Sequence, residues 1–179
     1  GFFELYINSK KVYDRVLEPA FTQYDKRALY SEFSVSEYLC EQENTIEVIL
    51  GDGWYNQTTR DTWGFYRAAW RDNPKFIFQL NAGDEIICSD ESWRVGTGPI
   101  VSNAIRAGEK IDARKKVEYN AFAVVVAPPG GILAPQTMPP IRECEMLKPV
   151  REERQNGYVL YDFGKTIAGY CSAYLSGEC

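Results

Sequence analysis

Apolar and polar side chains alternate in short runs along most of this chain. The clearest run covers residues 44–51, NTIEVILG, in which Ile46, Val48 and Leu50 occupy every second position. A period of two places alternate side chains on one face of a strand, so this run predicts a strand with one buried face. Similar extended runs cover residues 2–7, 11–17, 27–35, 75–80, 85–90 and 92–100.

Turn-forming residues separate these runs. Asn8, Ser9 and Lys10 fit a tight hairpin because asparagine tolerates a positive φ, and residues 81–84, NAGD, fit a second hairpin. Helix patterns are nearly absent, although residues 34–44, SVSEYLCEQEN, favour a single helical turn capped by serine. Short strands with glycine, asparagine and proline between them predict an all-β fold, a jelly-roll-like β-sandwich.

The composition changes after residue 127. Six prolines lie within residues 128–149, which predicts a stiff, extended connector. Residues 157–177, GYVLYDFGKTIAGYCSAYLSG, then begin new strand-like material. We therefore predict a β-sandwich domain over residues 1–127, followed by residues 128–179 as a proline-rich connector and the first strands of a second β-domain. Because both ends have strand character, we expect the chain to be part of a longer protein.

Charge and residue usage exclude several classes of function. The net charge of −5 argues against nucleic-acid binding, which depends on clustered lysine and arginine. The sequence has no histidine, which excludes Ser-His-Asp catalysis and histidine metal sites. No apolar run approaches the roughly 18 residues that a membrane-spanning helix needs. The sequence does not fix the compartment.

The five cysteines are widely spaced and show no C-x-x-C motif, so neither a zinc site nor a thioredoxin-like centre is indicated. An odd count in a domain of this size favours reduced thiols over a disulfide framework. Cys40 and Cys88 adjoin apolar runs, and we expect them to be small core residues.

Residues 51–70, GDGWYNQTTRDTWGFYRAAW, combine loop-forming residues with six aromatic side chains. Tryptophan and tyrosine offer flat apolar faces to the C–H groups of a sugar ring, and neighbouring Asp, Asn or Gln side chains can bind its hydroxyls. A carbohydrate site is therefore one hypothesis for this loop. The alternative, which composition alone favours, is that the aromatic side chains cap the end of the sandwich.

Acidic residues in or near loops raise two further hypotheses. Ca²⁺ takes about six to eight oxygen ligands, and the loops offer Asp25, Asp52, Asp61, Asp72 and Asn73. No EF-hand spacing is present, and the alternative is that these residues cap turns at the surface. Glycoside hydrolysis needs two carboxyl groups that face each other, but no pair among the 25 acidic residues has a distinguishing context.

Several stretches, taken in order, resemble bacterial α-L-rhamnosidases. Residues 2–35, FFELYINSKKVYDRVLEPAFTQYDKRALYSEFSV, resemble the pattern Y-E-L-Y-L-N-G-K-x-V followed by L-x-P-x-x-T-x-Y-x-K-R-x-x-Y. Residues 43–55, ENTIEVILGDGWY, are similar to E-N-x-I-x-x-x-L-G-N-G-W-Y. Residues 89–114, SDESWRVGTGPIVSNAIRAGEKIDAR, are similar to D-x-S-W-x-x-x-x-G-P-I-x-x-x-x-I-x-x-G-E-x-Y-D-A-R. Each motif is weak alone, but the ordered set covers almost the whole chain.

This resemblance implies the N-terminal accessory part of a glycoside hydrolase of family 78, with a jelly-roll-like, galactose-binding-like β-sandwich. Related modules are classed as family 67 carbohydrate-binding modules, which bind L-rhamnose together with a calcium ion. In the family, hydrolysis belongs to a later (α/α)₆ barrel whose glutamates invert the anomeric carbon, and that barrel has no counterpart in this sequence. The resemblance therefore implies a chain that recognises rhamnose-containing glycans without hydrolysing them, or a purely structural domain that packs on the barrel.

The resemblance also places the aromatic loop directly after a core strand, a position that suits a binding loop. Trp54 and Tyr55 are the predicted stacking residues, with Asp52 as the partner of a hydroxyl group or a cation. Trp70 and Asn73 are predicted to contribute at the far end of the loop. Exposure of several tryptophans on one concave face would favour binding, whereas burial of all of them would favour a structural role.

The sequence departs from the family pattern at several positions. Asp52 replaces the Asn of G-N-G-W-Y, Ser9 replaces the Gly of the N-G hairpin, and residues 115–127, KKVEYNAFAVVVA, look shorter than the usual stretch. If a calcium ion is bound, its predicted ligands are Asp25 and Asp72. Trp93 lies in an alternating strand, and we expect it in the core.

Overall fold

The computed structural model describes residues 1–174 and divides into two compact units, Gly1–Arg142 and Glu143–Cys179. Apart from two short 3₁₀ helices, every regular element is a β-strand, and no α-helix occurs between residues 1 and 174. The predicted all-β class is therefore confirmed. No helix within that part of the chain is long and apolar enough to cross a membrane.

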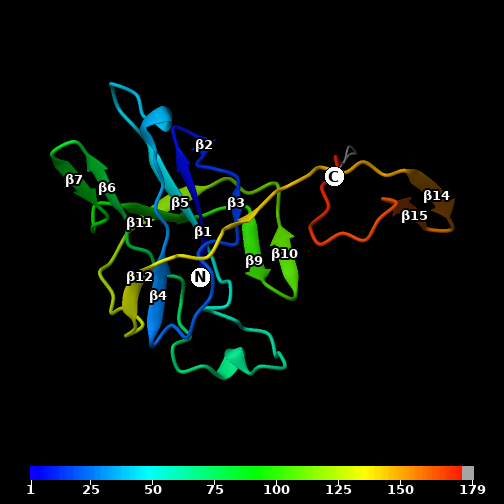
Figure 1. Ribbon diagram of the computed structural model, residues 1–179, viewed down its shortest axis with the longest axis horizontal. Helices are drawn as coiled ribbons and strands as arrows, with labels where there is room; N and C mark the ends of the chain where they lie inside the picture. The colour runs from blue at the N-terminus through cyan, green and yellow to red at the C-terminus, as the bar shows by residue number, and fades with distance from the viewer. Residues whose placement is uncertain (175–179) are drawn as a thin grey trace. The chain divides into compact units, whose positions relative to one another are not determined.

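The first unit combines one three-stranded sheet with several two-stranded pairs (Figure 1). Its strands are β1 (Phe2–Ile7), β2 (Lys10–Lys11), β3 (Arg15–Val16), β4 (Arg27–Tyr30), β5 (Ile46–Gly51), β6 (Gln79–Ala82), β7 (Glu85–Cys88), β8 (Arg94–Thr97), β9 (Ile100–Ala104), β10 (Gly108–Ile111), β11 (Glu118–Phe122), β12 (Ile132–Pro135) and β13 (Ile141–Arg142). The 3₁₀ helices are η1 (Ser36–Tyr38) and η2 (Phe65–Arg67). The second unit holds the antiparallel pair of β14 (Arg151–Gln155) and β15 (Tyr158–Asp162). The jelly-roll topology stays a prediction.

Strand β1 lies at the centre of the three-stranded sheet, in the order β2-β1-β5, and carries the core of the first unit. Its apolar side chains lie opposite those of β5, because the register pairs Leu5 with Val48 and Ile7 with Ile46. Ile7 is completely buried, and Leu5 and Val12 are nearly so. The alternation in residues 44–51 thus predicted the strand and the face that packs on the core, where Ile46 and Val48 are half-buried.

Both predicted hairpins are present. Asn8 and Ser9 have φ values of 51° and 63°, the left-handed conformation of a tight two-residue turn between β1 and β2. The Asn8 amide nitrogen donates to the Tyr38 carbonyl oxygen at 2.9 Å, and its amide oxygen accepts from the Thr45 backbone N–H at 3.0 Å. Gly83, with φ of 64°, lies in the turn between β6 and β7. The first hairpin is therefore tied to η1 and to the start of β5.

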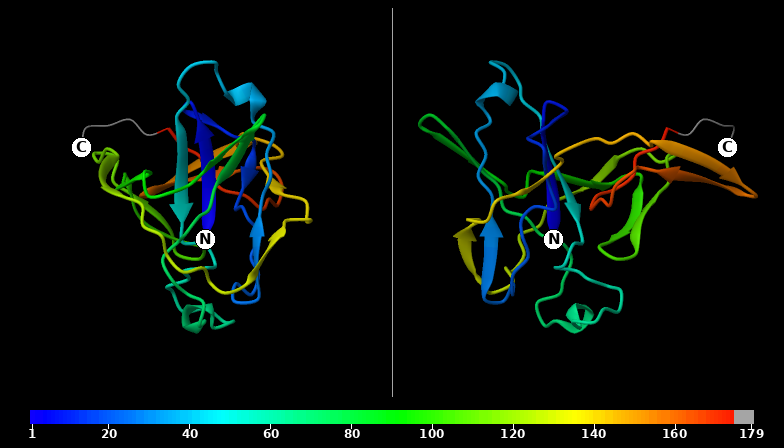
Figure 2. Two further views of the ribbon diagram at one scale, coloured as in Figure 1. Left: turned by 90° about the vertical axis from the view of Figure 1, so that its left-hand side faces the viewer. Right: turned by 45° about the vertical axis from the view of Figure 1, so that its right-hand side comes forward.

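The division into units differs from the predicted boundary near residue 127. Strand β12 pairs in parallel with β4, and β13 pairs in antiparallel with β3, so both belong to the first unit (Figures 1 and 2). The Gln136 amide group accepts from the Ala20 backbone N–H at 2.8 Å and donates to the Glu18 carboxylate at 3.1 Å. A proline-rich segment is extended whether it links domains or adds strands, and proline is tolerated in a sheet where its missing N–H has no partner.

Two smaller expectations have different outcomes. Cys40 and Cys88 are exposed, so their predicted place in the core is wrong. Both lie where apolar runs meet turns, and adjacency in sequence does not give burial. Trp93 was expected in the core, but it is only half-buried, with its ring centroid 5.2 Å from that of Phe76 and 5.5 Å from that of Phe78.

The turn at Asn8 and Ser9 gives a test of stability. An L-residue in the left-handed region is strained, and glycine is not, although glycine loses more backbone entropy on folding. Ser9→Gly should therefore raise the free energy of unfolding by about 0.5–1 kcal/mol. Urea unfolding followed by circular dichroism measures the free energy of unfolding of each variant. Ser9→Ala, which keeps the strain, is the matched control, and equal stability of the two variants would contradict the prediction.

Candidate functional site

The aromatic loop, residues 52–74, lies in the connection between β5 and β6 and is anchored at its start by Asp52. The Asp52 backbone N–H donates to the Asn103 side-chain oxygen at 2.9 Å, which ties the loop to β9. The Asp52 carboxylate accepts from the Asn56 side-chain amide at 2.8 Å. Gly53 has φ of 52°, and a Cβ there would approach Phe2 to 3.0 Å. Asp52 and Gly53 therefore build the turn itself.

Ring contacts hold the loop on the segment between β3 and β4. Tyr24 packs edge-to-face against Tyr55, with ring centroids 5.1 Å apart, and against Trp70 at 6.2 Å. Trp54 contacts Phe21 at 5.7 Å. Further contacts join Trp54, Trp63, Phe65 and Trp70 into one aromatic cluster. Edge-to-face and offset pairs of this kind add about 0.5–1.5 kcal/mol each beyond their buried area.

The aromatic cluster has a buried half and an exposed half. Tyr24 and Tyr55 are buried, whereas Trp63 is 61% exposed and Phe21 is 53% exposed. Trp54 and Trp70 are half-buried. The loop therefore combines a buried half, which suits a structural cap, with an exposed half. Trp63 is the more exposed of these rings, and the Arg106 guanidinium lies over it.

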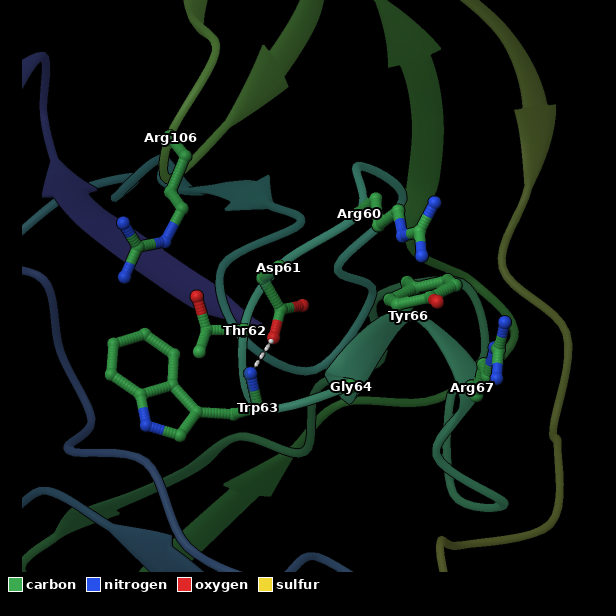
Figure 3. Close-up of a pocket in the computed structure, with 8 residues that line it drawn as sticks. All are labelled: Arg60, Asp61, Thr62, Trp63, Gly64, Tyr66, Arg67 and Arg106. Atoms are coloured by element: carbon green, nitrogen blue, oxygen red, sulfur yellow. Dashed lines mark hydrogen bonds between the residues drawn. The ribbon is translucent and has the colours of Figure 1, made fainter.

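An open hollow of about 620 Å³ lies beside Trp63 (Figure 3). Its lining consists of Arg60, Asp61, Thr62, Trp63, Gly64, Tyr66, Arg67 and Arg106. Arg106 comes from the turn between β9 and β10, and the carbon of its guanidinium lies 4.7 Å from the centre of the Trp63 ring. In Figure 3, Arg106 reaches over the tryptophan, while Tyr66 lies between Arg60 and Arg67 on the other side of Asp61.

Asp61 holds the turn that carries Trp63 at the edge of the hollow. One of its carboxylate oxygens accepts from the backbone N–H of Trp63 at 2.8 Å and from that of Phe65 at 3.3 Å. Gly64, with φ of 75°, lets the chain reverse before η2. The exposed position of Trp63 therefore results from an aspartate-capped turn.

The electrostatics and chemistry of the hollow suit binding better than hydrolysis. Three guanidinium groups and one carboxylate line it. Hydrolysis of a glycoside uses two carboxyl groups across the scissile bond, and the lining supplies one. A tryptophan face next to arginine, threonine and tyrosine side chains can instead hold a sugar ring and its hydroxyl groups.

The residues predicted to bind sugar do not line this hollow. Asp52 holds the turn at the start of the loop, Tyr55 is buried, and Trp54 supports Trp63 from within the cluster at 6.0 Å. Trp70 is half-buried against Tyr24. Asn73 is exposed, and its backbone N–H donates to Asp72. Their role as sugar ligands stays a prediction.

The two predicted calcium ligands are engaged differently. Asp72 forms an ion pair with Lys75 at 2.6 Å, and the hydrogen bond from Lys75 lowers the pKa of its carboxyl group. One carboxylate oxygen of Asp25 is buried without a hydrogen-bond partner among the described residues. Within residues 1–174, no group of three acidic, cysteine or histidine side chains is placed to hold a metal ion. The role of Asp25 and Asp72 as calcium ligands stays a prediction.

Comparison with known proteins gives the family. The family profile described as alpha-L-rhamnosidase N-terminal domain matches residues 1–145. The chain belongs to this family. It is 30% identical to an α-L-rhamnosidase of Formosa agariphila, over 98% of this chain and 20% of that protein. It is 26% identical to one of Streptomyces avermitilis, over 99% and 19%. The chain thus spans about a fifth of the length of these relatives.

Solved structures of α-L-rhamnosidases share the fold of this family member. The enzyme from Dictyoglumus thermophilum has a TM-score of 0.73 at 34% identity, covering 92% of this chain and 19% of that chain. The Streptomyces avermitilis enzyme, complexed with L-rhamnose, has a TM-score of 0.80 at 24% identity, covering 92% and 17%. At this identity the second likeness shows the fold alone.

Sequence reasoning missed most of the hollow. Trp54 and Tyr55, which follow the glycine turn, were predicted to stack on a sugar, and Trp63 was not. Sequence reasoning did not select Arg60, Tyr66 and Arg67 from the same stretch. Arg106 belongs to another hairpin, and no local pattern linked it to the loop.

The buried Tyr24 hydroxyl gives a test of the cluster. It makes no hydrogen bond with the described residues, and burial, followed by the nearby Tyr55, raises the pKa of Tyr24 to about 12. In the unfolded chain the Tyr24 hydroxyl ionises near pH 10, whereas in the folded chain it stays protonated up to about pH 12. The free energy of unfolding should therefore fall as pH rises from 10 to 12, by at most about 2–3 kcal/mol.

Tyr24→Phe should remove this part of the alkaline loss, and at pH 7 it should not destabilise the fold, because it deletes an unpaired buried hydroxyl. Denaturant unfolding at a series of pH values between 7 and 12 measures both effects. An unchanged alkaline slope in the variant would show that the Tyr24 hydroxyl is in contact with water.

Proposed function

We propose that this chain is a non-catalytic carbohydrate-recognition domain of an α-L-rhamnosidase that hydrolyses terminal α-L-rhamnose from glycans or glycosides. The relatives named above are α-L-rhamnosidases, and this chain corresponds to about a fifth of their length. Hydrolysis then belongs to the remaining part of such an enzyme, which we expect to include the (α/α)₆ barrel. The partner of this domain is a glycan that contains L-rhamnose.

The observation that carries the proposal is the exposed Trp63 ring at the edge of the hollow. An indole ring that is 61% exposed, next to an open hollow of about 620 Å³, provides a flat apolar platform with polar groups around it. A sugar ring has C–H groups on its faces and hydroxyl groups on its rim, so it can stack on the platform while its rim binds the polar groups. The support from Trp54 and the Asp61 turn holds the platform in place before binding, which limits the entropy lost on binding.

A calorimetric titration of the full chain with L-rhamnose, and with methyl α-L-rhamnoside, tests this proposal. We expect saturable heat, and we expect Trp63→Ala to weaken binding at least about fivefold, which corresponds to roughly 1 kcal/mol of lost stacking. Runs with calcium chloride and with EDTA show whether the ion contributes.

Phe122→Ala is the matched control, because Phe122 is an equally exposed aromatic residue outside the loop, at 66%. Circular dichroism shows whether each variant is folded. The absence of heat from the folded wild-type chain with both ligands would overturn the sugar-binding proposal.

A second candidate function, structural packing on the rest of the enzyme, is favoured by a different observation. Val124, Val125 and Val126 follow β11 and are 73%, 81% and 51% exposed. Consecutive exposed valines next to the exposed Phe122 form an apolar surface that a folded protein usually covers. The remaining length of the relatives is the proposed cover. Both functions can belong to one domain, since the valines and the hollow involve different residues.

Replacing Val124, Val125 and Val126 together by serine tests this second candidate. Exposed side chains contribute little to the chain itself, so its free energy of unfolding should change by no more than about 0.5 kcal/mol. Self-association of the isolated chain should decrease, as measured by analytical ultracentrifugation. A longer polypeptide that contains the domain should lose thermal stability. Lys116→Ser in the same segment is the control, and an equal effect of both changes would contradict packing at the valines.

A further inference from the structure

The hollow beside Trp63 concentrates positive charge on an acidic chain. Arg60, Arg67 and Arg106 all line it, and all three are exposed. None of them forms an ion pair with an acidic residue in the described part of the chain. The whole chain has a net charge of −5. A cluster of guanidinium groups without carboxylate partners is therefore a local exception to the charge of the protein.

Asp61 is the one carboxylate in the lining, and it is already engaged. One oxygen accepts two backbone N–H groups, and the other is buried away from solvent. Its negative charge offsets one of the three guanidinium groups, so the hollow keeps a positive balance. Arg60 precedes η2, Arg67 is the last residue of η2, and Arg106 lies in the β9–β10 turn. Figure 3 shows Arg60 and Arg67 beside Tyr66, and Arg106 beside Trp63.

Packing against aromatic rings explains only part of this arrangement. Arg106 stacks on Trp63, and the guanidinium of Arg67 lies 5.0 Å from the centre of the Tyr66 ring. Such contacts are worth about 0.5–1 kcal/mol at exposed sites. They leave the N–H groups at the guanidinium edges available for oxygen atoms. Planar, divergent N–H donors of this kind match the oxygens of a carboxylate or a sulfate group.

We propose that the hollow binds an oxyanion, a carboxylate or a sulfate ester, carried by an acidic sugar whose ring packs against the part of Trp63 that Arg106 leaves exposed. This inference rests on the proposed sugar-binding function of the same hollow and adds the chemical class of its ligand. Trp63 selects for a ring, and the arginines select for negative charge on it. The glycan recognised by this domain is then an acidic one, in which charged residues accompany rhamnose.

A matched pair of ligands isolates the charge. Methyl β-D-glucuronide and methyl β-D-glucoside share the ring and differ at C6, where one has a carboxylate and the other a hydroxymethyl group. In calorimetric titrations of the full chain at low salt, we expect the glucuronide to bind at least about tenfold more tightly. The preference should shrink as sodium chloride screens the arginines. The 6-sulfate of methyl β-D-glucoside, as a third ligand, distinguishes a sulfate site from a carboxylate site.

Single substitutions assign the preference to the arginines. Arg60→Gln, Arg67→Gln and Arg106→Gln should each bring the ratio of the two dissociation constants closer to 1, because each removes one positive charge. Arg71→Gln, an exposed arginine outside the lining, is the matched control and should keep the ratio. Because the readout is a ratio measured on one folded variant, a general loss of stability does not imitate it.

The outcomes separate this inference from the proposed function. Equal binding of methyl β-D-glucuronide, methyl β-D-glucoside and its 6-sulfate, with L-rhamnose also bound, would overturn the oxyanion site and leave the sugar-binding proposal standing. Binding of the charged glucosides without any binding of L-rhamnose or its methyl glycoside would support the oxyanion site and overturn rhamnose recognition. A lack of binding by every sugar would overturn both.

Discussion

The buried carboxylate of Glu18 is the constraint on which the arrangement of the first unit depends. Glu18 is only 3% exposed, and a buried charge is costly unless hydrogen bonds and opposite charges surround it. Ser31 and Gln136 donate hydrogen bonds to it, and the Arg15 guanidinium lies 4.0 Å away. The Phe3 backbone N–H donates to its carbonyl oxygen at 2.9 Å. The Glu18 side chain therefore joins the segments that follow β4 and β12 to its own segment after β3, and its backbone carbonyl joins that segment to β1.

This constraint reaches the candidate site through a short stretch of chain. Phe21 and Tyr24 follow Glu18 closely, and both pack against the aromatic loop, on Trp54 and on Tyr55 and Trp70. The loop lacks long strands of its own, so ring contacts and the Asp52 and Asp61 turns determine its shape. The burial of the inner rings is what leaves the outer ring, Trp63, in a defined exposed position. Structural capping and the proposed ligand binding would in this sense be two consequences of one cluster.

The periodicity of the sequence predicted individual strands and turns, but it could not predict contacts between segments that are distant in the sequence. The alternation in Ile46, Val48 and Leu50 was sufficient for β5, and Asn8 with Ser9 was sufficient for the first hairpin. The many aromatic residues in residues 51–70 identified the loop. The sequence could not predict which tryptophan is exposed, because that depends on contacts with Phe21 and Tyr24 from another segment. The pairing of β12 with β4 could not be predicted, because a proline-rich segment is as compatible with an edge strand as with a linker.

Arg106 lies in a turn, on a hairpin separate from the loop that it faces. Neither the Glu18 hydrogen bonds nor the buried rings involve it. A change at this one position can therefore alter the charge presented to a ligand while the scaffold stays intact. Under the proposed function, a substitution in the β9–β10 turn would change ligand selectivity without affecting folding. Homologous domains would then diverge in glycan preference through single substitutions, without passing through misfolded intermediates.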